Sequence, residues 1–444
     1  MQISSPLRSA IKQNMRKRGY NFSALSEKSG IRRGSLSLIF VGGSSRQNPI
    51  SFPHLKKITQ ALALPEDAFF ELYIDECFLG GRPNRSRIEP FLERCIELGH
   101  PSCIEKVLHR LGGEPRYLPF LFEIAERKNK EETNSLTVRL YEYLLIHNGD
   151  RHSVETAICR YRLFLLRLNQ DEENNSRVLN AFSPYRDNLP EEFKLEALTV
   201  MGGLCFNRMD AEELDTFANE LIALCVRLFG TEDQAPCKPF NPERKLTRPA
   251  VVYYSQGYVM KQIALCEKGD FHEAEAYSQR YEDLSWLAGE DEDMRQTVAD
   301  LKLFAHANRI GCRLLNGEIH VLPEYIELLG LHPHERVPGL IILLKAANLH
   351  RISIDEYLPR FPIDLHRLLD MQSNTYTKQI GRNRFARLLY QLSIYHFNRG
   401  RIEESLQAAL QSWELSHQLN NHRMFRLLSS LTLMYSEQAD PPDL

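Results

Sequence analysis

Leu25-Ser26-Glu27-Lys28-Ser29-Gly30-Ile31, followed by Ser35-Leu36-Ser37, is the stretch that decides the fold of this chain. Its spacing predicts two short helices, over Phe22–Ser29 and about Arg33–Phe40, with Gly30 at the turn, where a positive φ favours glycine. Asn21 is a suitable cap for the first helix, because its side chain can accept hydrogen bonds from free first-turn amides. The small Ser26 suits a place where two helices cross closely.

The second of these helices is predicted to have two different faces. Leu36 and Ile39 bury one face, and the other presents Arg32, Arg33, Ser35, Ser37 and Leu38. This is the geometry that places a recognition helix in the major groove of DNA. Either arginine can reach guanine O6 and N7 or a phosphate, and Ser37 and Leu38 can meet a base or a thymine methyl group. Ser35 is a predicted phosphate contact, as is Arg46 in the following loop.

The flanking sequence predicts three more helices. The first begins at Ser4-Ser5-Pro6 and ends at Gly19. Its apolar face carries Leu7, Ile11 and Met15, and its basic face carries Arg8, Lys12, Arg16, Lys17 and Arg18. Helices over Phe52–Leu62 and Pro65–Tyr73 follow, and their predicted core residues are Leu55, Ile58, Leu62, Leu64, Phe69 and Leu72.

Positive charge is concentrated in this part of the chain. The first 64 residues contain 11 Lys and Arg and one acid, Glu27, whereas the rest contains 44 Lys and Arg (55 − 11) and 57 acids (58 − 1). Basic residues that neutralise phosphates release counterions, which favours binding to nucleic acid. The alternative is a basic but inert surface. Charge alone does not distinguish the two, so the helix pattern has to decide between them.

Residues 5–75 resemble the Cro/C1-repressor, or XRE-like, helix-turn-helix domain, a five-helix DNA-binding unit. The resemblance rests on Leu25–Ile31, Ser35-Leu36-Ser37, Gly42 and Leu55-Lys56-Lys57-Ile58-Thr59-Gln60-Ala61-Leu62. It implies binding to double-stranded DNA. Phe40 departs from the family, which often carries Glu there, so the loop after the recognition helix is expected to be held differently.

Composition excludes several classes of protein. The chain of 444 residues is 43% hydrophobic and 25% charged, which is typical of a folded protein of two to four units. No apolar run reaches 18 residues, so we expect no signal peptide, no membrane contact and a cytoplasmic location. Nine cysteines without a CxxC pair predict reduced, buried thiols. We expect no metal site, including at His332-Pro333-His334-Glu335, no cofactor, no catalytic residues and no enzymatic activity, because no nucleotide-binding, metalloprotease or nucleophile motif is present.

From about Arg85 onward the pattern predicts helix after helix, so the whole chain is expected to be all-α with an α-solenoid after the N-terminal domain. Two segments fit a 34-residue tetratricopeptide (TPR) unit, around Gly269 and Gly400, with small Ala274 and Ser405 where paired helices cross. Leu195–Phe229 is a more degenerate pair. A plain helical bundle is the alternative. Breaks between helices are expected at Gln234–Pro249 and at Leu322–Pro338.

This layout is similar to the RRNPP group of peptide-sensing regulators, including their arbitrium-receptor relatives. The predicted parts are a DNA-binding domain at 1–78, degenerate repeats at 79–233, and TPR-like repeats with a peptide groove and a dimerisation end at 250–444. The resemblance implies a quorum-sensing transcriptional regulator. In such proteins a short signalling peptide binds the concave groove, and a homodimer spaces two DNA-binding heads on an operator that we expect to be an inverted repeat.

Candidate peptide-binding residues are those whose side chains could bind an extended backbone or a terminal carboxylate. They are Gln256, Asn308, Arg309, Asn348, Asn383, Arg384, Arg387 and Tyr390. For each, the alternative is a polar residue satisfied within the protein or a helix cap. At the level of function, the alternatives are an XRE–TPR regulator controlled by a protein partner, and an enzyme-modulating TPR protein whose N-terminal domain no longer binds DNA.

Overall fold

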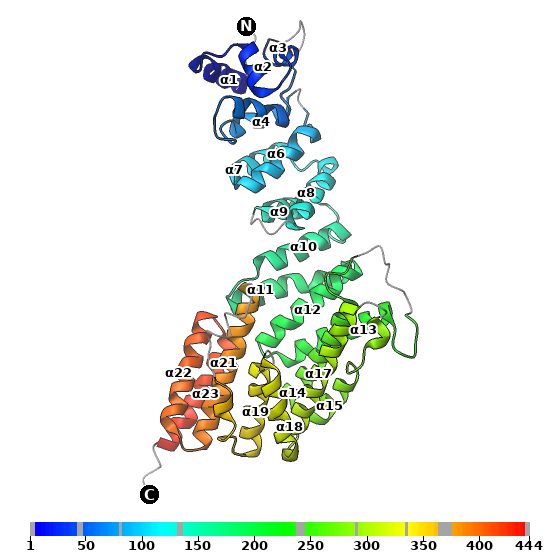
Figure 1. Ribbon diagram of the computed structural model, residues 1–444, viewed down its shortest axis with the longest axis vertical. Coiled ribbons are helices and arrows are strands. Elements are labelled where there is room, and N and C mark those ends of the chain that lie inside the picture. Colours follow the sequence, from blue (N-terminus) through cyan, green and yellow to red (C-terminus); the bar gives the residue numbers. More distant parts are fainter. Residues whose placement is uncertain are drawn as a thin grey trace. The chain divides into compact units, whose positions relative to one another are not determined.

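The structure, a computed structural model, describes residues 5–41, 48–79, 82–130, 136–236, 245–288, 292–333, 336–362 and 375–439. Within these ranges the chain is all-α, as the sequence predicts, apart from an isolated β-bridge between Thr231 and Gln234. The chain divides into two compact units, Met1–Leu166 and Arg167–Leu444 (Figure 1). Among the helices of the described ranges, none combines the length and apolar composition that a membrane crossing requires.

The first unit begins with helices α1 Pro6–Lys17, α2 Phe22–Ser29, α3 Arg33–Phe40, α4 Phe52–Ala61 and α5 Phe70–Cys77. Leu7, Ile11 and Met15 form the buried face of α1, which confirms the predicted apolar stripe. The core continues without a break beyond α5, since the rings of Phe52 and Phe91 lie 5.6 Å apart in an edge-to-face contact. Burial of these faces is the main force that holds such short helices together.

The fifth helix lies further along the chain than the sequence predicted. The prediction was Pro65–Tyr73, but residues 66–69 form turns and α5 runs from Phe70 to Cys77. The reason is the spacing of the apolar residues, because Phe70, Tyr73, Ile74 and Cys77 follow the helical i, i+3, i+4, i+7 pattern and all are buried.

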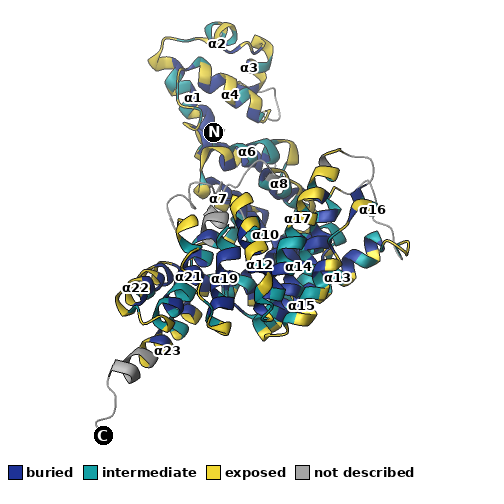
Figure 2. Cartoon of the chain, turned by 60° about the horizontal axis from the view of Figure 1, so that its bottom comes forward, coloured by how far each residue is buried: buried dark blue, intermediate teal, exposed yellow. Residues whose placement is uncertain are grey.

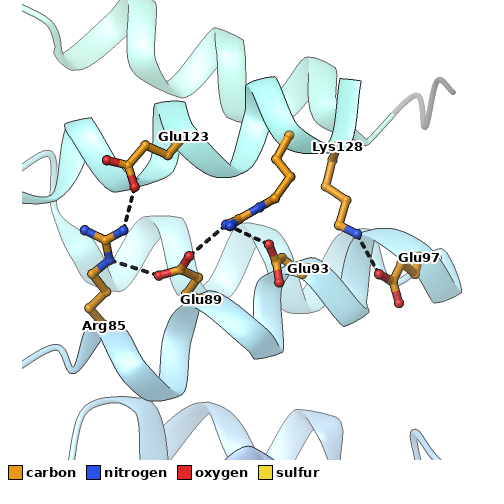
Figure 3. A network of polar contacts seen from close by, with 7 residues as sticks. Arg85, Glu89, Glu93, Glu97, Glu123 and Lys128 are labelled. Atoms are coloured by element: carbon orange, nitrogen blue, oxygen red, sulfur yellow. Dashed lines mark hydrogen bonds and ion pairs between the residues drawn. The ribbon is translucent and has the colours of Figure 1, made fainter. Parts of the chain in front are cut away.

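Helices α6 Arg85–Leu98, α7 Pro101–Leu111, α8 Leu118–Lys130, α9 Thr137–His147 and α10 Val154–Arg167 follow. Ion pairs line the contact between α6 and α8 (Figure 3). Glu89 lies between Arg85, at 2.9 Å, and Arg127, at 2.7 Å, and Lys128 donates to Glu97 at 2.6 Å. Partly exposed pairs of this kind contribute about 0–1 kcal/mol each, so they orient the two helices more than they stabilise them.

The second unit contains α11 Glu172–Phe182, α12 Glu191–Asn207, α13 Ala211–Phe229, α14 Ala250–Lys268, α15 Phe271–Gln279, α16 Ser285–Ala288, α17 Glu292–Leu315, α18 Leu322–Leu331, α19 Arg336–His350, α21 Thr375–Asn398, α22 Ile402–Gln418 and α23 His422–Ala439. Most helices pack against the next described one, and α12 and α17 also pack against α14. Gly269 ends α14 with a φ of +92°, which is where the repeat pattern placed a tight turn. Ala274 and Ser405, the predicted small residues, are both fully buried.

One predicted break between helices is confirmed and the other is wrong. The described residues between Phe229 and Ala250 contain no helix, as four prolines in this segment predicted. The second predicted break, Leu322–Pro338, instead contains α18 and the beginning of α19. Pro323 lies in the first turn of α18, where the missing N–H would have had no helical partner, so it starts the helix instead of ending it.

The beginning of the second unit is bonded to residues near its end, as the adjacent positions of α11 and α21 in Figure 1 illustrate. The backbone N–H of Glu172 donates to the carbonyl of Leu419 at 2.9 Å, and Asn383 donates to the Glu172 carboxylate at 2.6 Å. Asn420 donates to Asp171 at 3.2 Å. The helices of this unit therefore return on themselves, and the contact that closes them is largely polar.

Candidate functional site

The turn between α2 and α3 has the geometry that its sequence predicts. Gly30 is left-handed, with a φ of +66°, and ends α2. The Asn21 side chain caps the other end of α2 by accepting a 2.9 Å hydrogen bond from the Ala24 amide. The Ser26 hydroxyl donates to the Ile31 carbonyl at 2.6 Å. The left-handed Gly30 and the Ser26 hydrogen bond set the direction in which α3 leaves the turn.

Helix α3 has one buried and one exposed side. Leu36, Ile39 and Phe40 are buried, and the Phe40 ring stacks on Phe22 with centroids 5.6 Å apart. The residues predicted to contact DNA lie on the other side: Arg32, Arg33, Ser37 and Leu38 are exposed and Ser35 is half-buried. Leu38 is 52% exposed, although it lies on the same helix as three buried apolar residues. The structure therefore brings these five residues together at one surface.

The end of α3 is held by two basic residues of α1. Arg8 donates through Nε to the Ile39 carbonyl at 2.9 Å, and Lys12 donates to the Phe40 carbonyl at 3.1 Å. These carbonyls lie in the last turn of α3, where the C=O groups have no N–H donor within the helix. Placing Arg8 on the exposed basic face of the first helix was wrong, because it is fully buried and paired with Glu76.

Glu76 of α5 is a buried acid that holds both Arg8 and the chain after α3. Its carboxylate forms a buried ion pair with Arg8 of α1. Glu76 also accepts a hydrogen bond from the Ile50 amide at 2.9 Å, and Arg8 donates to the Asn48 carbonyl at 2.7 Å. The chain after α3 is thus anchored at Asn48 and Ile50.

The exposed side of α3 offers positive charge and free backbone donors. No side chain caps the first turn of α3, so its first amides have no helical acceptor. Across the described residues, the side chains of Arg32 and Arg33 take part in no hydrogen bond or ion pair. A helix start with free amides and two unpaired guanidinium groups is suited to phosphate. Arg46, the sixth predicted DNA contact, lies outside the described residues.

In the second unit, the predicted peptide-binding residues divide into separate groups. Asn308 and Arg309 lie on α17, and both have partners within the protein. Asn308 donates to the Tyr281 hydroxyl at 2.9 Å, and Arg309 pairs with Glu282 at 3.0 Å. The Tyr281 hydroxyl in turn donates to Gln262 of α14 at 2.8 Å. Gln256, also on α14, is half-buried.

Asn348 and Asn383 form contacts between helices. Asn348 of α19 donates to the Gln391 carbonyl of α21 at 2.9 Å. Asn383 lies well inside α21 and is buried, between Glu172 and Asn421. These are the contacts that an internally satisfied polar residue makes, and a ligand at either position would have to displace them.

Arg384 and Arg387 gather with residues that the sequence did not single out. Both guanidinium groups lie over the Phe206 ring of α12, at 5.6 and 5.0 Å from its centroid, a cation–π arrangement. Arg387 also pairs with Glu267 at 2.7 Å, and Lys345 lies 3.8 Å from the same carboxylate. We call Phe206, Glu267, Lys345, Arg384 and Arg387 the α21 cluster. Tyr390, one turn further along α21, packs instead with Met209, Met424 and Leu428.

Electrostatics in the α21 cluster favour an anionic ligand. Burial alone would raise the pKa of Glu267, but Arg387 and Lys345 overcome this effect and the pKa is lowered. Glu267 is therefore a carboxylate at neutral pH. It pairs with Arg387 and Lys345, and Arg384 adds a third cationic side chain to the cluster. Sequence reasoning missed Glu267 because a lone acid at the end of a helix has no pattern that distinguishes it.

Asn207 is a further residue that the sequence did not indicate. It follows Phe206 at the end of α12, is 1% exposed, and neither its amide nitrogen nor its carbonyl oxygen has a hydrogen-bond partner in the described part of the chain. An unpaired buried donor or acceptor costs about 1–3 kcal/mol, so such groups are rare without a functional reason. Asn207 carries both a donor and an acceptor, as an extended peptide backbone requires.

Comparisons with known proteins add no assignment: no family model and no curated protein matches this chain. In the described ranges, no group of three or more His, Cys, Asp or Glu residues has the arrangement needed to hold a metal ion. His332 lies between α18 and α19, and its predicted neighbours His334 and Glu335 fall outside those ranges.

Proposed function

We propose that this chain is a DNA-binding transcriptional regulator controlled by a short intracellular signalling peptide that binds the helices of its second unit. The observation that carries the proposal is the two-sided α3. Its apolar side is buried and its end is anchored by Arg8 and Lys12, while Arg32, Arg33, Ser37 and Leu38 are exposed. We interpret α1 to α5 as a Cro/C1-like helix-turn-helix domain, and α3 as its recognition helix.

In the proposed complex, the beginning of α3 enters the major groove of an operator. The guanidinium groups of Arg32 and Arg33 contact guanine edges or phosphates, and the first-turn amides contact phosphate. Ser37 and Leu38, one turn further on, meet a base or a thymine methyl group. The scarcity of acids in the first 64 residues supports this mode of binding, because it leaves little negative charge to repel the DNA backbone.

The helix pairs of the second unit are proposed to be TPR-like repeats that bind the peptide. Support comes from the tight turn at Gly269, the buried small residues Ala274 and Ser405, and the positive charge of the α21 cluster. In that cluster Arg384 and Arg387 are suited to a carboxylate of the peptide, and the neighbouring Asn207 is suited to its backbone. The peptide would compete with Glu267 for Arg387, which allows binding to change how α14 and α21 are held.

A homodimer is proposed to form through α22. Ile402, Leu406, Leu410 and Trp413 follow an i, i+4, i+8, i+11 spacing along one side of this helix, and all four are exposed. Figure 2 shows exposed residues on α22 in yellow. An open hollow lies beside Leu410, Trp413 and His417. A second copy of the same helix would bury this stripe in a two-fold contact, and two heads related by a two-fold axis fit an inverted-repeat operator.

Control by a protein partner is the alternative that a specific observation favours. Asn308, Arg309, Asn348, Asn383 and Arg387 already have partners within the chain. If these contacts persist, the unit has few free groups for a peptide, and the apolar stripe on α22 becomes a surface for a helix of another protein. No catalytic role is part of either proposal.

The experiment that separates these proposals uses the full chain and DNA fragments from upstream of its own gene. Binding that weakens steeply with added salt supports the helix-turn-helix interpretation. Synthetic peptides encoded by short reading frames next to the gene are then added. A peptide that shifts both the melting temperature and the DNA affinity supports peptide control. DNA binding with no response to any of these peptides favours the protein partner.

A further inference from the structure

Two cysteines from different helices lie side by side in the second unit. The Sγ atoms of Cys266, near the end of α14, and Cys312, near the end of α17, are 3.6 Å apart. Cys312 is 3% exposed, whereas Cys266 is only partly buried, so Cys266 is the member of the pair that lies nearer to solvent. By contrast, Cys225 of α13 is buried and its pKa is raised by burial alone. The pair therefore combines two adjacent thiols with one residue that is less buried than an ordinary core cysteine.

The surroundings of the pair favour one thiol as the nucleophile. Gln262 donates through Nε2 to the Cys312 sulfur at 3.2 Å. The hydrogen bond from Cys266 lowers the pKa of Cys312, and Gln262 adds to this effect against the opposing effect of burial. The contact with Cys312 and burial both raise the pKa of Cys266, so the proton is held on Cys266. Thiolate character together with access is what makes a cysteine sensitive to peroxide.

We propose that Cys266 and Cys312 are a peroxide-sensitive pair that forms a reversible disulfide between α14 and α17. The Cys312 thiolate attacks hydrogen peroxide, an S–O bond forms, the O–O bond breaks, and the leaving hydroxide is protonated to water. Cys266 then attacks the sulfenic sulfur, the S–S bond forms, the S–O bond breaks, and the Cys266 proton leaves with hydroxide as a second water. The two sulfurs lose two electrons in total, and the peroxide gains them.

The disulfide would act on residues of the candidate peptide site. Forming it brings the two sulfurs from 3.6 Å to about 2.05 Å and takes away the thiolate that accepts the Gln262 hydrogen bond. Gln262 also accepts from Tyr281, which accepts from Asn308. On the other side, the backbone carbonyl of Cys266 accepts from Lys345 of the α21 cluster at 3.0 Å. Oxidation of the pair is thus expected to alter the hydrogen bonds that hold Asn308 and the α21 cluster. Only this effect on the candidate peptide site rests on the proposed function; the disulfide itself does not.

The disulfide is tested on the reduced full chain, treated with hydrogen peroxide under native conditions, alkylated and mapped by mass spectrometry. We expect a cross-linked peptide containing Cys266 and Cys312, lighter than the sum of its parts by two hydrogen atoms and restored to two thiols by dithiothreitol. Cys225→Ser is the matched control and keeps the cross-link. Cys266→Ser leaves Cys312 as a sulfenic acid that dimedone traps, and Cys312→Ser loses this trapping.

The wild-type chain alone can overturn the proposal, even if the serine variants do not fold. The contradicting result is alkylation of both Cys266 and Cys312 after peroxide treatment, in chain that circular dichroism shows to be folded throughout. The link to the candidate site is read separately, by hydrogen exchange of the α17 amides around Asn308. We expect exchange there to differ between the oxidised and reduced chains, and equal exchange contradicts the link but not the disulfide. Neither measurement uses DNA or peptide, so both are independent of the proposed regulatory function.

Discussion

Arg8 and Glu76 form a buried ion pair that joins α1 to α5 and fixes the end of α3. The Arg8 Nη2 atom also lies 3.2 Å from the second carboxylate oxygen of Glu76, so the two groups meet in a two-point contact. Arg8 then donates to the Ile39 carbonyl, and Glu76 accepts from the Ile50 amide. The orientation of the proposed recognition helix therefore depends on a buried charge pair that lies away from the exposed side of α3.

Removing one member of this pair should destabilise the first unit strongly. Arg8→Ala or Glu76→Ala leaves an uncompensated buried charge, which costs about 3–5 kcal/mol. The double variant Arg8→Met/Glu76→Leu removes both charges and should lose much less than the sum of the single changes. Free energies of unfolding from urea titration provide the measurement, with the exposed Arg16→Ala as the control. Equal small losses for all variants would show that the pair does not hold α3.

Two buried asparagines should respond in opposite directions to the same change. Among the described residues the Asn207 side chain has no hydrogen-bond partner, whereas Asn383 bonds to Glu172 and Asn421. Asn207→Leu removes an unpaired donor and acceptor and should raise the free energy of unfolding by about 1 kcal/mol. Asn383→Leu removes a hydrogen-bond partner of Glu172 and Asn421 and should lower the free energy of unfolding by about 1–3 kcal/mol. Urea titration measures both. Destabilisation by Asn207→Leu as large as that by Asn383→Leu contradicts the unpaired assignment.

Acid should weaken the contact between Glu66 and Arg94 within a defined range. The hydrogen bond from Arg94, with help from Lys56, lowers the pKa of Glu66 from 4.5 to about 2. A lowered carboxyl pKa contributes stability that is present above 4.5 and is lost as the pH falls towards 2. The difference in unfolding free energy between wild type and Glu66→Gln should shrink across this range. The exposed Glu27→Gln is the control, and a pH-independent difference for Glu66→Gln runs against the assigned shift.

Charge on the apolar stripe of α22 should abolish the proposed dimer. Leu410 is 69% exposed and lies in the middle of the stripe, so Leu410→Glu would bury a carboxylate in the two-fold contact. We expect sedimentation velocity to give a dimer for wild type and a monomer for Leu410→Glu. Leu331→Glu on α18, at 72% exposure, is the matched control and should remain dimeric. A wild-type monomer at all concentrations excludes the proposed dimer.

The sequence predicted the elements whose causes are local. The cap at Asn21, the left-handed Gly30 and the apolar stripe of α1 depend on nearby residues, and all three are confirmed. The fifth helix was predicted to begin too early, at Pro65, whereas the buried i, i+3, i+4, i+7 pattern begins at Phe70. The helix at Leu322 was missed because Pro323 was taken to break a helix, although it lies in the first turn of one. Single-sequence patterns do not distinguish these two uses of proline.

The contacts that assemble the candidate sites could not be predicted, because they join residues far apart in the chain. Glu76 lies 68 residues from Arg8, and Glu267 lies 120 residues from Arg387. Arg8 fits an exposed basic face as well as its neighbours do, and only the position of α5 shows that it is buried. The polar residues predicted for the peptide site were chosen by their residue type, which can be read from the sequence. Asn207 is identified by the lack of hydrogen-bond partners among the described residues, which only the structure shows.

DNA binding by the exposed side of α3 is the central claim, and the direct measurement is the affinity of the full chain for its own upstream DNA. Wild type, Arg32→Ala/Arg33→Ala and the control Arg426→Ala, an exposed arginine of α23, are compared at several salt concentrations. We expect the double variant to lose about 1–3 kcal/mol for each base contact, or to show a salt dependence shallower by about one for each phosphate contact. The control should match wild type. Unchanged affinity and salt dependence in the double variant would contradict the assignment of α3 as the recognition helix.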